Sequence, residues 1–334
     1  TFRDNAMKHL QRLLGALTLW SLLGAAPAAA RGGPECIAPA KPGGGFDLTC
    51  KLARAALNGK YLGGPLQLSY MPGGVGAVAF NVVVTQRPAE RHTRVAFSEG
   101  TLLNLAQGKF GRHDASEVRW VAGIALDHGV LMVAQDSPIE SIQDLLTALK
   151  ADPAQIVFGA GGTIGSQDWM KVALTARAAG LDHRKMRFVA FEGGGEAMTA
   201  LQDGHVQVYS GDAAEALAQI RIGKRIRILA VMAEQRLQGV LADVPTAKEQ
   251  GLDIVWPIVR GFYIGPQVSD GDYHHWVATF TEMLATPEFA RLREQRGLDP
   301  FAKTGAELDT YVRQRVATYR ELARQFGLKV AAPH

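Results

Sequence analysis

Short apolar runs alternate with runs of helical periodicity along most of the chain. Residues 35–38 are apolar enough for a buried strand, and the apolar positions after residue 48 recur at helical spacing until Asn58 and Gly59 end the run. The same order of strand, glycine loop and helix recurs at residues 66–84, 155–168, 186–198 and 206–217. This alternation predicts the α/β class, with parallel sheets that carry helices on both faces.

Two helix starts and one long apolar stretch add detail to this pattern. Ser141 precedes a helical run, and Asp144 three residues later completes an N-terminal capping pair. Thr304 and Glu307 form a capping box at the start of a long amphipathic helix in the tail. Residues 118–134 are long and apolar, and we expect two strands there.

Glycine clusters lie where the predicted strands end and the predicted helices begin. There are four of them: Gly43–Gly45; Gly73, Gly74 and Gly76; Gly161, Gly162 and Gly165; and Gly193–Gly195. Glycine permits positive φ and lets another molecule approach the backbone, and a helix start suits an anion. One such loop alone is most simply a tight turn. Four of them at the carboxyl ends of strands favour a ligand cleft between two domains.

The N-terminal segment has the features of a secretory signal peptide. Basic residues after Met7 precede an apolar stretch at 13–26, and small residues follow before Arg31. The apolar stretch is shorter than the roughly 20 residues that a membrane anchor needs. We therefore expect residues 1–30 to be a cleaved leader and the protein to be exported. In an oxidising compartment the only two cysteines, Cys36 and Cys50, are expected to form a disulfide.

Composition and motifs argue against several function classes. The formal net charge is +4 and the basic residues are scattered, so no nucleic-acid partner is expected. No Walker A, H-E-x-x-H or G-x-S-x-G motif is present, and the glycine run at 159–165 departs from the dinucleotide-binding spacing. The histidines have no companions at metal-ligand spacing. We expect no cofactor, no metal and no enzymatic activity.

Several stretches occur in an order that resembles a known receptor family. They are PAKPGGGFD, MPGGVGA, VFGAGGTIGSQD, FVAFEGGGEAMTALQDGHVQV, GKRIRILAVMAEQR and DVPTAKEQG. Together they resemble the periplasmic substrate-binding receptors of tripartite tricarboxylate transporters, also called Bug receptors. The resemblance covers essentially the whole mature chain.

The resemblance implies a periplasmic protein with a two-lobed, type II-like periplasmic-binding-protein fold that closes around a small carboxylate. Lobe 1 would comprise residues 31–130 and 236–334, and lobe 2 residues 131–235. The implied partners are the ligand and two integral membrane subunits, and we expect a monomer. The implied ligand contacts are Gly44, Gly45, Phe46, Asp47, Gly74, Val75, Gly162, Thr163, Ser166, Gly194 and Asp212.

Three residues need separate interpretation. Phe46 stands where the family usually has a small Thr or Ser, and citrate-type members can carry an aromatic there, so a tricarboxylate is the favoured ligand. Asp47 is more simply the N-cap of the first helix than a ligand contact. Arg260 is either a charge partner for a ligand carboxylate or a surface arginine on the last crossover.

Two other functions remain open from the sequence. The same fold can present its ligand to a membrane sensor kinase instead of a transporter. A secreted α/β enzyme acting on a carboxylate is the other alternative, but the clustered acid and base residues that it needs are not evident in the sequence.

Overall fold

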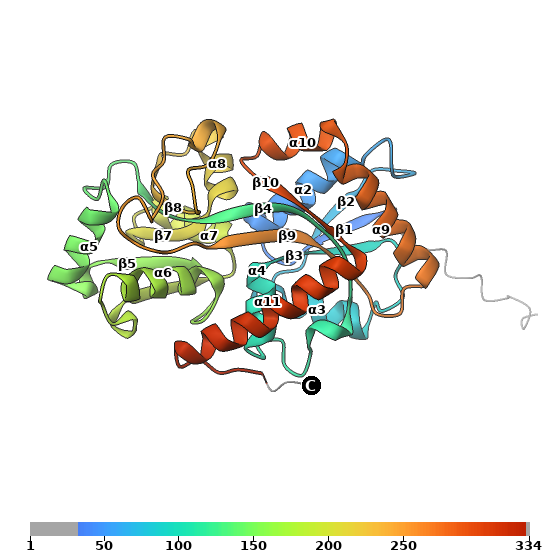
Figure 1. Cartoon of the computed structure of the whole chain (residues 1–334), viewed down its shortest axis with the longest axis horizontal. Coiled ribbons are helices and arrows are strands. Elements are labelled where there is room, and N and C mark those ends of the chain that lie inside the picture. The colour runs from blue at the N-terminus through green and yellow to red at the C-terminus, as the bar shows by residue number, and fades with distance from the viewer. Residues whose placement is uncertain (1–32, 332–334) are drawn as a thin grey trace, which may run out of the picture. The chain divides into compact units, whose positions relative to one another are not determined.

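A computed structural model describes residues 33–331, so the predicted leader at residues 1–30 lies outside the described part of the chain. In residues 33–331, no helix is both long enough and apolar enough to cross a membrane. The fold is a mixed α/β fold with two lobes, each built on its own set of strands (Figure 1).

Lobe 1 is built on three parallel strands. Strand β1 (Glu35–Ala38) lies between β2 (Gln67–Tyr70) and β3 (Thr93–Ser98) and pairs with both in parallel. The helices that follow these strands are α2 (Gly45–Leu57), α3 (Ala77–Thr85) and α4 (Glu99–Ala106). The predicted order of strand, loop and helix is therefore confirmed here.

Lobe 2 repeats this arrangement. Strand β5 (Val157–Gly161) pairs in parallel with β6 (Arg187–Phe191) and with β7 (Val208–Asp212). Its helices are α5 (Ile142–Ala151), α6 (Gln167–Ala178), α7 (Gly194–Gln202) and α8 (Ala213–Arg221), and its last strand is β8 (Ile226–Met232).

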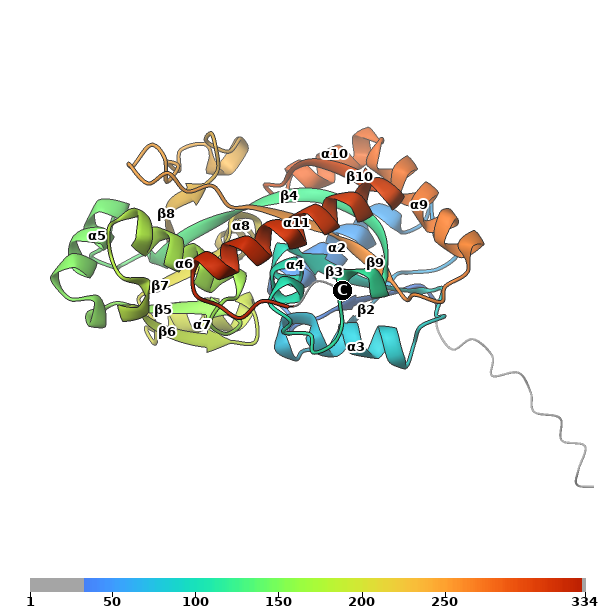
Figure 2. The same ribbon diagram turned by 60° about the horizontal axis from the view of Figure 1, so that its bottom comes forward.

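The remaining elements follow lobe 2 or connect the main ones. They are β9 (Pro257–Ile264), α9 (Asp270–Leu284), α10 (Pro287–Glu294), β10 (Asp299–Thr304) and α11 (Gly305–Gln325). Short 3-10 helices occur at η1 (Gly74–Gly76), η2 (Ala115–Glu117), η3 (Pro153–Gln155), η4 (His183–Lys185) and η5 (Gly239–Leu241). Helix α11 contacts α4 and β4, and Figure 2 shows it lying across them.

A single long strand joins the two lobes. Strand β4 (Arg119–Ala134) pairs with β9 and β10 in its first part and with β7 and β8 from Gly129 onward. The prediction of two strands in this stretch was wrong, because one strand changes partners without a turn. Strands β4 and β9 run side by side between the lobes (Figures 1 and 2).

The prediction of parallel sheets holds only for the strands within each lobe. Strands β4, β8, β9 and β10 pair in antiparallel fashion. They differ because β4 and β9 carry the chain from lobe to lobe in opposite directions. The predicted lobe boundaries at residues 130/131 and 235/236 stay a prediction, since a lobe is defined by moving as one body.

Both faces of the lobe 1 sheet are buried. Val95 and Phe97 of β3 point into one core cluster, whereas Ala96 between them points into another. The first cluster contains residues of α3, α4 and α11, and the second contains residues of α2, α9 and α10. Strand residues alternate between faces, so helices on both sides exclude water from the sheet.

The two predicted helix caps differ in outcome. The Ser141 side chain accepts the N–H of Asp144, whose carboxylate accepts the N–H of Ser141, so this capping pair is confirmed. The Thr304 side chain makes no cap hydrogen bond, so the capping box there was wrong. Instead Thr304 bonds to the hydroxyl of Thr281, and Glu307 pairs with Lys303.

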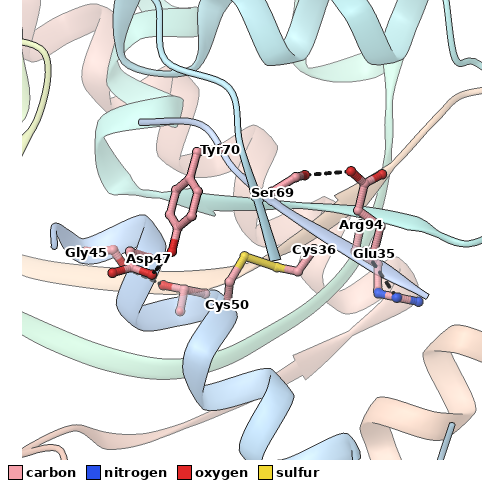
Figure 3. The surroundings of a disulfide bond; sticks show 9 residues. Glu35, Cys36, Gly45, Asp47, Cys50, Ser69, Tyr70 and Arg94 are labelled. Atoms are coloured by element: carbon pink, nitrogen blue, oxygen red, sulfur yellow. Dashed lines mark hydrogen bonds between the residues drawn. A yellow bond between two sulfur atoms is a disulfide. The ribbon is translucent and has the colours of Figure 1, made fainter. Parts of the chain in front are cut away.

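The predicted disulfide between Cys36 and Cys50 is confirmed (Figure 3). Cys36 lies on β1 and Cys50 on α2, their Cα atoms are 5.8 Å apart, and both residues are fully buried. The bridge therefore closes the first glycine loop and fixes the start of α2 relative to the strand before it.

We predict that replacing Cys36 and Cys50 together with Ala lowers the free energy of unfolding by about 3 kcal/mol. The chain-entropy model gives this value for a closed loop of about 15 residues. Denaturant unfolding monitored by circular dichroism measures the change. Parent protein treated with a reductant should lose a similar amount, and a double variant that unfolds with the parent's midpoint would contradict the prediction.

Candidate functional site

Two helix starts without side-chain caps lie at the ends of β1 and β6. Gly44 is the N-cap of α2 and Gly193 is the N-cap of α7, and neither N-cap makes a side-chain cap hydrogen bond. The first N–H groups of a helix have no intrahelical partner and carry a partial positive charge. Each start therefore offers donors that suit an anion.

The two helix starts face each other at backbone contact distance. A Cβ built on Gly44 would lie 3.4 Å from the backbone nitrogen of Gly194 and 3.5 Å from that of Gly195. A Cβ built on Gly195 would lie 2.6 Å from the carbonyl oxygen of Pro42. A Cβ at Gly44 would thus touch the facing loop at van der Waals distance, and the backbone conformation does not require glycine there, because its φ is −97°.

These loops enclose a cavity of about 40 Å³. Among the predicted ligand residues, the ones that line it are Gly44, Gly45, Phe46, Val75, Ser166, Gly194, Asp212 and Arg260. A groove of about 1060 Å³ shares Val75 and Ser166 with the cavity and is also lined by Gly74, Gly162 and Thr163. The structure brings these residues together, and their contact with a ligand stays a prediction.

Val75 has a strained backbone beside this cavity. Its φ and ψ are 49° and 52°, and among the residues other than glycine that the structure describes it alone has positive φ. Left-handed backbone is rare for a β-branched residue, and such strain is concentrated at functional sites. Its side chain closes against Gly162 of lobe 2, where a Cβ would lie 3.0 Å from the Val75 Cγ2.

Asp47 is directed away from the cavity and stabilises the glycine loop. Its carboxylate accepts the N–H of Gly43 at 2.9 Å and the hydroxyl of Tyr70 at 2.8 Å (Figure 3), and it pairs with Lys51. The predicted N-cap position was wrong, because Gly44 is the N-cap. The predicted bonding to backbone N–H was right.

Arg260 lies at the floor of the cavity and is 1% exposed, so the surface alternative was wrong. Its Nε donates to Asp127 at 3.0 Å, and its Nη2 donates to Asp212 at 2.9 Å. The Nη1 atom lies so close to Gly45 that a Cβ on that residue would overlap it. Among the described residues Nη1 has no hydrogen-bond acceptor, so it remains available to a ligand.

A second buried cation, Lys171, extends this network into lobe 2. Its ammonium contacts Asp168 and Asp212 at 3.0 Å each and donates to the carbonyl oxygen of Gly211. Burial raises the pKa of Asp168 to about 6, despite the opposing effect of Lys171. Burial also tends to raise the pKa of Asp212, but Lys171 and Arg260 together hold it below its ordinary value.

Three polar contacts hold the lobes together around the cavity. Lys41 of the first glycine loop pairs with Glu196 of α7. The side-chain nitrogen of Gln107 donates to the carbonyl oxygen of Gly165 at 2.6 Å, and Lys109 donates to that of Ile164 at 2.6 Å. Burial lowers the pKa of Lys109 to about 8. The lobes are therefore in a closed arrangement.

Sequence reasoning missed the buried charges around Arg260. Asp127 and Lys171 carry no local motif, and their respective partners Arg260 and Asp212 lie far along the chain. Glu215, which also lines the cavity, had one signal: it stands three residues after the predicted contact Asp212. Within residues 33–331, no group of three or more His, Cys, Asp or Glu residues is arranged to hold a metal ion.

Comparison with known proteins identifies the class to which this fold and cleft belong. The model of the tripartite tricarboxylate transporter family receptor matches residues 53–328. The chain therefore belongs to this receptor family, whose members are solute-binding receptors and not enzymes.

Curated relatives and solved structures agree with this assignment. A UPF0065 protein of Cupriavidus necator, encoded in the gbd 5' region, is 23% identical over 281 residues, which is 81% of each chain. MatC of Rhodopseudomonas palustris, solved with bound malate, has a TM-score of 0.76 at 21% identity and covers 87% of this chain and 98% of its own. R. palustris Rpa4515, solved with adipate, has a TM-score of 0.80 at 19% identity, with 89% and 98% coverage. These structures show the fold.

We predict that Arg260→Met destabilises the protein by about 3–5 kcal/mol, because it leaves the buried carboxylates of Asp127 and Asp212 without this partner. Arg236→Met is the matched control. Arg236 and its partner Glu249 are about half exposed, at 47% and 45%, and an exposed pair contributes about 0–1 kcal/mol. Denaturant unfolding of both variants measures the difference, and equal losses would contradict the prediction.

Proposed function

We propose that this protein is a periplasmic receptor that captures a small carboxylate by closing its lobes and delivers it to two membrane subunits of a tripartite tricarboxylate transporter. The observation that carries this proposal is the pair of uncapped helix starts, α2 from lobe 1 and α7 from lobe 2, which face each other across one cavity. A carboxylate between them would accept N–H groups from both lobes.

The size of the cavity bears on how a ligand could enter it. About 40 Å³ is far below the roughly 300–1,000 Å³ of typical ligand sites. A ligand held in this cavity therefore requires the lobes to lie further apart than they do here, both while it enters and once it is bound. The continuous strands β4 and β9 are where such a hinge motion would occur, because they are the two strands that run from one lobe to the other.

Two structural neighbours support a carboxylate ligand, since one was solved with malate and the other with adipate. Among carboxylates, the family resemblance favours a tricarboxylate such as citrate, because citrate-type members can carry an aromatic residue at the position of Phe46. This ring is 7% exposed and lines the cavity, where it would meet an apolar part of a ligand. The tricarboxylate stays a prediction.

We predict that Gly44→Val and Gly194→Val each weaken carboxylate binding at least tenfold. At Gly44 the added atoms would separate the two helix starts, and at Gly194 a Cβ would overlap the Glu215 carboxylate. The loss of one charge-assisted hydrogen bond, about 1.5–3 kcal/mol, corresponds to this change in affinity. Titration calorimetry measures it, with the best ligand from a thermal-shift screen of di- and tricarboxylates.

Gly63→Val is the matched control, because a Cβ there meets nothing within 4 Å and its φ is not positive. The exposed His274→Ala on α9 serves as a second control. Each variant must keep the parent's circular dichroism spectrum. Folded glycine variants that bind as tightly as the parent would show that the loops are only turns.

A further inference from the structure

Helix α11 is attached to lobe 1, yet its last turn reaches lobe 2. Arg315 and Tyr319 in the middle of the helix both donate to the carboxylate of Glu99 on α4, at 2.5 and 2.7 Å. Figure 2 shows the far end of α11 beside α6 of lobe 2, where Phe326 contacts Trp169. The helix therefore extends from one lobe to the other.

Phe326, the residue that ends α11, packs among three side chains of lobe 2. Its ring centroid lies 6.2 Å from that of Trp169 and 5.1 Å from that of His183, both in edge-on arrangements. The guanidinium carbon of Arg177 lies 4.3 Å from the same ring. The three partners belong to α6 and η4, and Phe326 is 7% exposed. Edge-on ring pairs and cation–π contacts are both attractive, so this site holds the ring on lobe 2.

The chain reverses directly after Phe326 and returns to lobe 1. Gly327 has a φ of 67°, and the N–H of Leu328 donates to the carbonyl oxygen of Ala323 at 2.9 Å. A left-handed glycine after the last helical turn is a common way to end a helix and redirect the chain. The N–H of Ala331 then donates to the carbonyl oxygen of Ala106 on α4 at 2.9 Å.

Residues 326–331, here called the strap, therefore contact both lobes where they meet. A Cβ built on Gly165 of lobe 2 would lie 3.1 Å from the Leu328 Cδ1. The carbonyl oxygen of Gly165 is also the acceptor for Gln107 of lobe 1. The next residue, Ser166, lines the cavity. The strap thus lies against a loop that contributes directly to the cavity.

The lobes cannot separate while all contacts of the strap are kept. Separation moves α6 away from α4, but α11 is bonded to α4 through Glu99, and Phe326 is packed on α6. A bend in α11 would be the alternative. The helix contains no proline, and its one glycine is its first residue, Gly305, so it lacks the residues at which helices commonly kink. The ring of Phe326 must therefore leave its site when the lobes open.

We propose that the strap is an autoinhibitory device that holds the receptor in its closed form. That form has a cavity of only about 40 Å³, so Phe326 must leave lobe 2 before a ligand enters. This inference rests on the proposed function for the ligand that enters, but it does not depend on which carboxylate that is. It assigns control of opening to a segment outside the cavity lining.

Distance measurements on the empty protein test the strap without any ligand. Glu288→Cys on α10 of lobe 1 and Lys150→Cys on α5 of lobe 2 replace two exposed residues and carry spin labels. The two native cysteines are joined to each other, so only the introduced thiols react. We expect Phe326→Ala to lower the ratio of closed to open protein by about tenfold, because two ring pairs and a cation–π contact are lost.

Phe301→Ala is the matched control. Its ring packs edge-on against Tyr311 at 5.1 Å, and this pair joins β10 to α11 without involving α6. We expect the control to keep the parent's distance distribution even where it lowers the melting temperature. An unchanged distribution in Phe326→Ala, or an equal shift in both variants, would overturn the strap.

Arg177→Met tests the same contact from the side of lobe 2. Arg177 is exposed, so this variant should fold, and losing the cation over the ring should lower the ratio of closed to open protein by about two- to fivefold. If Phe326→Ala does not fold, this variant decides. A distribution like the parent's would then overturn the strap.

Stopped-flow binding of the best carboxylate from the thermal-shift screen tests the autoinhibition. Since only the open protein admits a ligand, we expect Phe326→Ala to bind faster than the parent, by up to about tenfold where the empty parent is mostly closed. Slower binding would overturn the autoinhibitory role. Failure of the parent to bind any carboxylate would overturn the proposed function instead, and the distances in the empty protein would still decide whether the strap holds the lobes closed.

Discussion

The buried ion pairs of Arg260 connect the parts of this receptor that the cleft depends on. Arg260 lies on β9, Asp127 lies on β4 where that strand passes between the lobes, and Asp212 ends β7 in lobe 2. One guanidinium therefore joins both crossing strands to the second sheet. The same side chain packs under Gly45, so the first turn of α2 lies against the positive charge of Arg260 on the crossing strand β9.

This network explains why the cavity floor is charged although the loops above it are bare backbone. A buried arginine is tolerated when several carboxylates surround it, and each carboxylate then needs its own partners. Asp212 has Lys171 as a second cation, and Asp127 also accepts the N–H groups of His128 and Ala214. Glu215 is the member that keeps one carboxylate oxygen, Oε1, without a hydrogen-bond partner among the described residues.

The sequence predicted the local features of the site and missed the distant ones. Glycine loops between a strand and a helix leave a local pattern, and those loops occur where they were expected. The pairing of Arg260 with Asp127 joins residues 133 positions apart, and no local pattern records it. The capping box at Thr304 failed for a related reason, because a tertiary contact with Thr281 replaced the local bond.

The same limit applies to the strands. The hydrophobic pattern predicted strand structure at residues 118–134, but it did not show that one strand would belong to two sheets. Each half of β4 pairs with a different set of strands, and the sequence of β4 alone does not show which strands these are. The parallel order within each lobe was predictable, since consecutive strand–helix units tend to pack side by side.

The contacts of Lys41, Gln107 and Lys109 across the lobes join protein groups directly, and they therefore affect how the receptor divides between open and closed forms. Each contact that stabilises the closed form raises the fraction of empty receptor that is already closed. Premature closure blocks ligand entry, yet it also lowers the free energy that the ligand must supply. An empty closed receptor would also compete with a loaded one for the membrane partner that we propose. The strength of these three contacts therefore sets a balance between affinity for the ligand and unproductive docking.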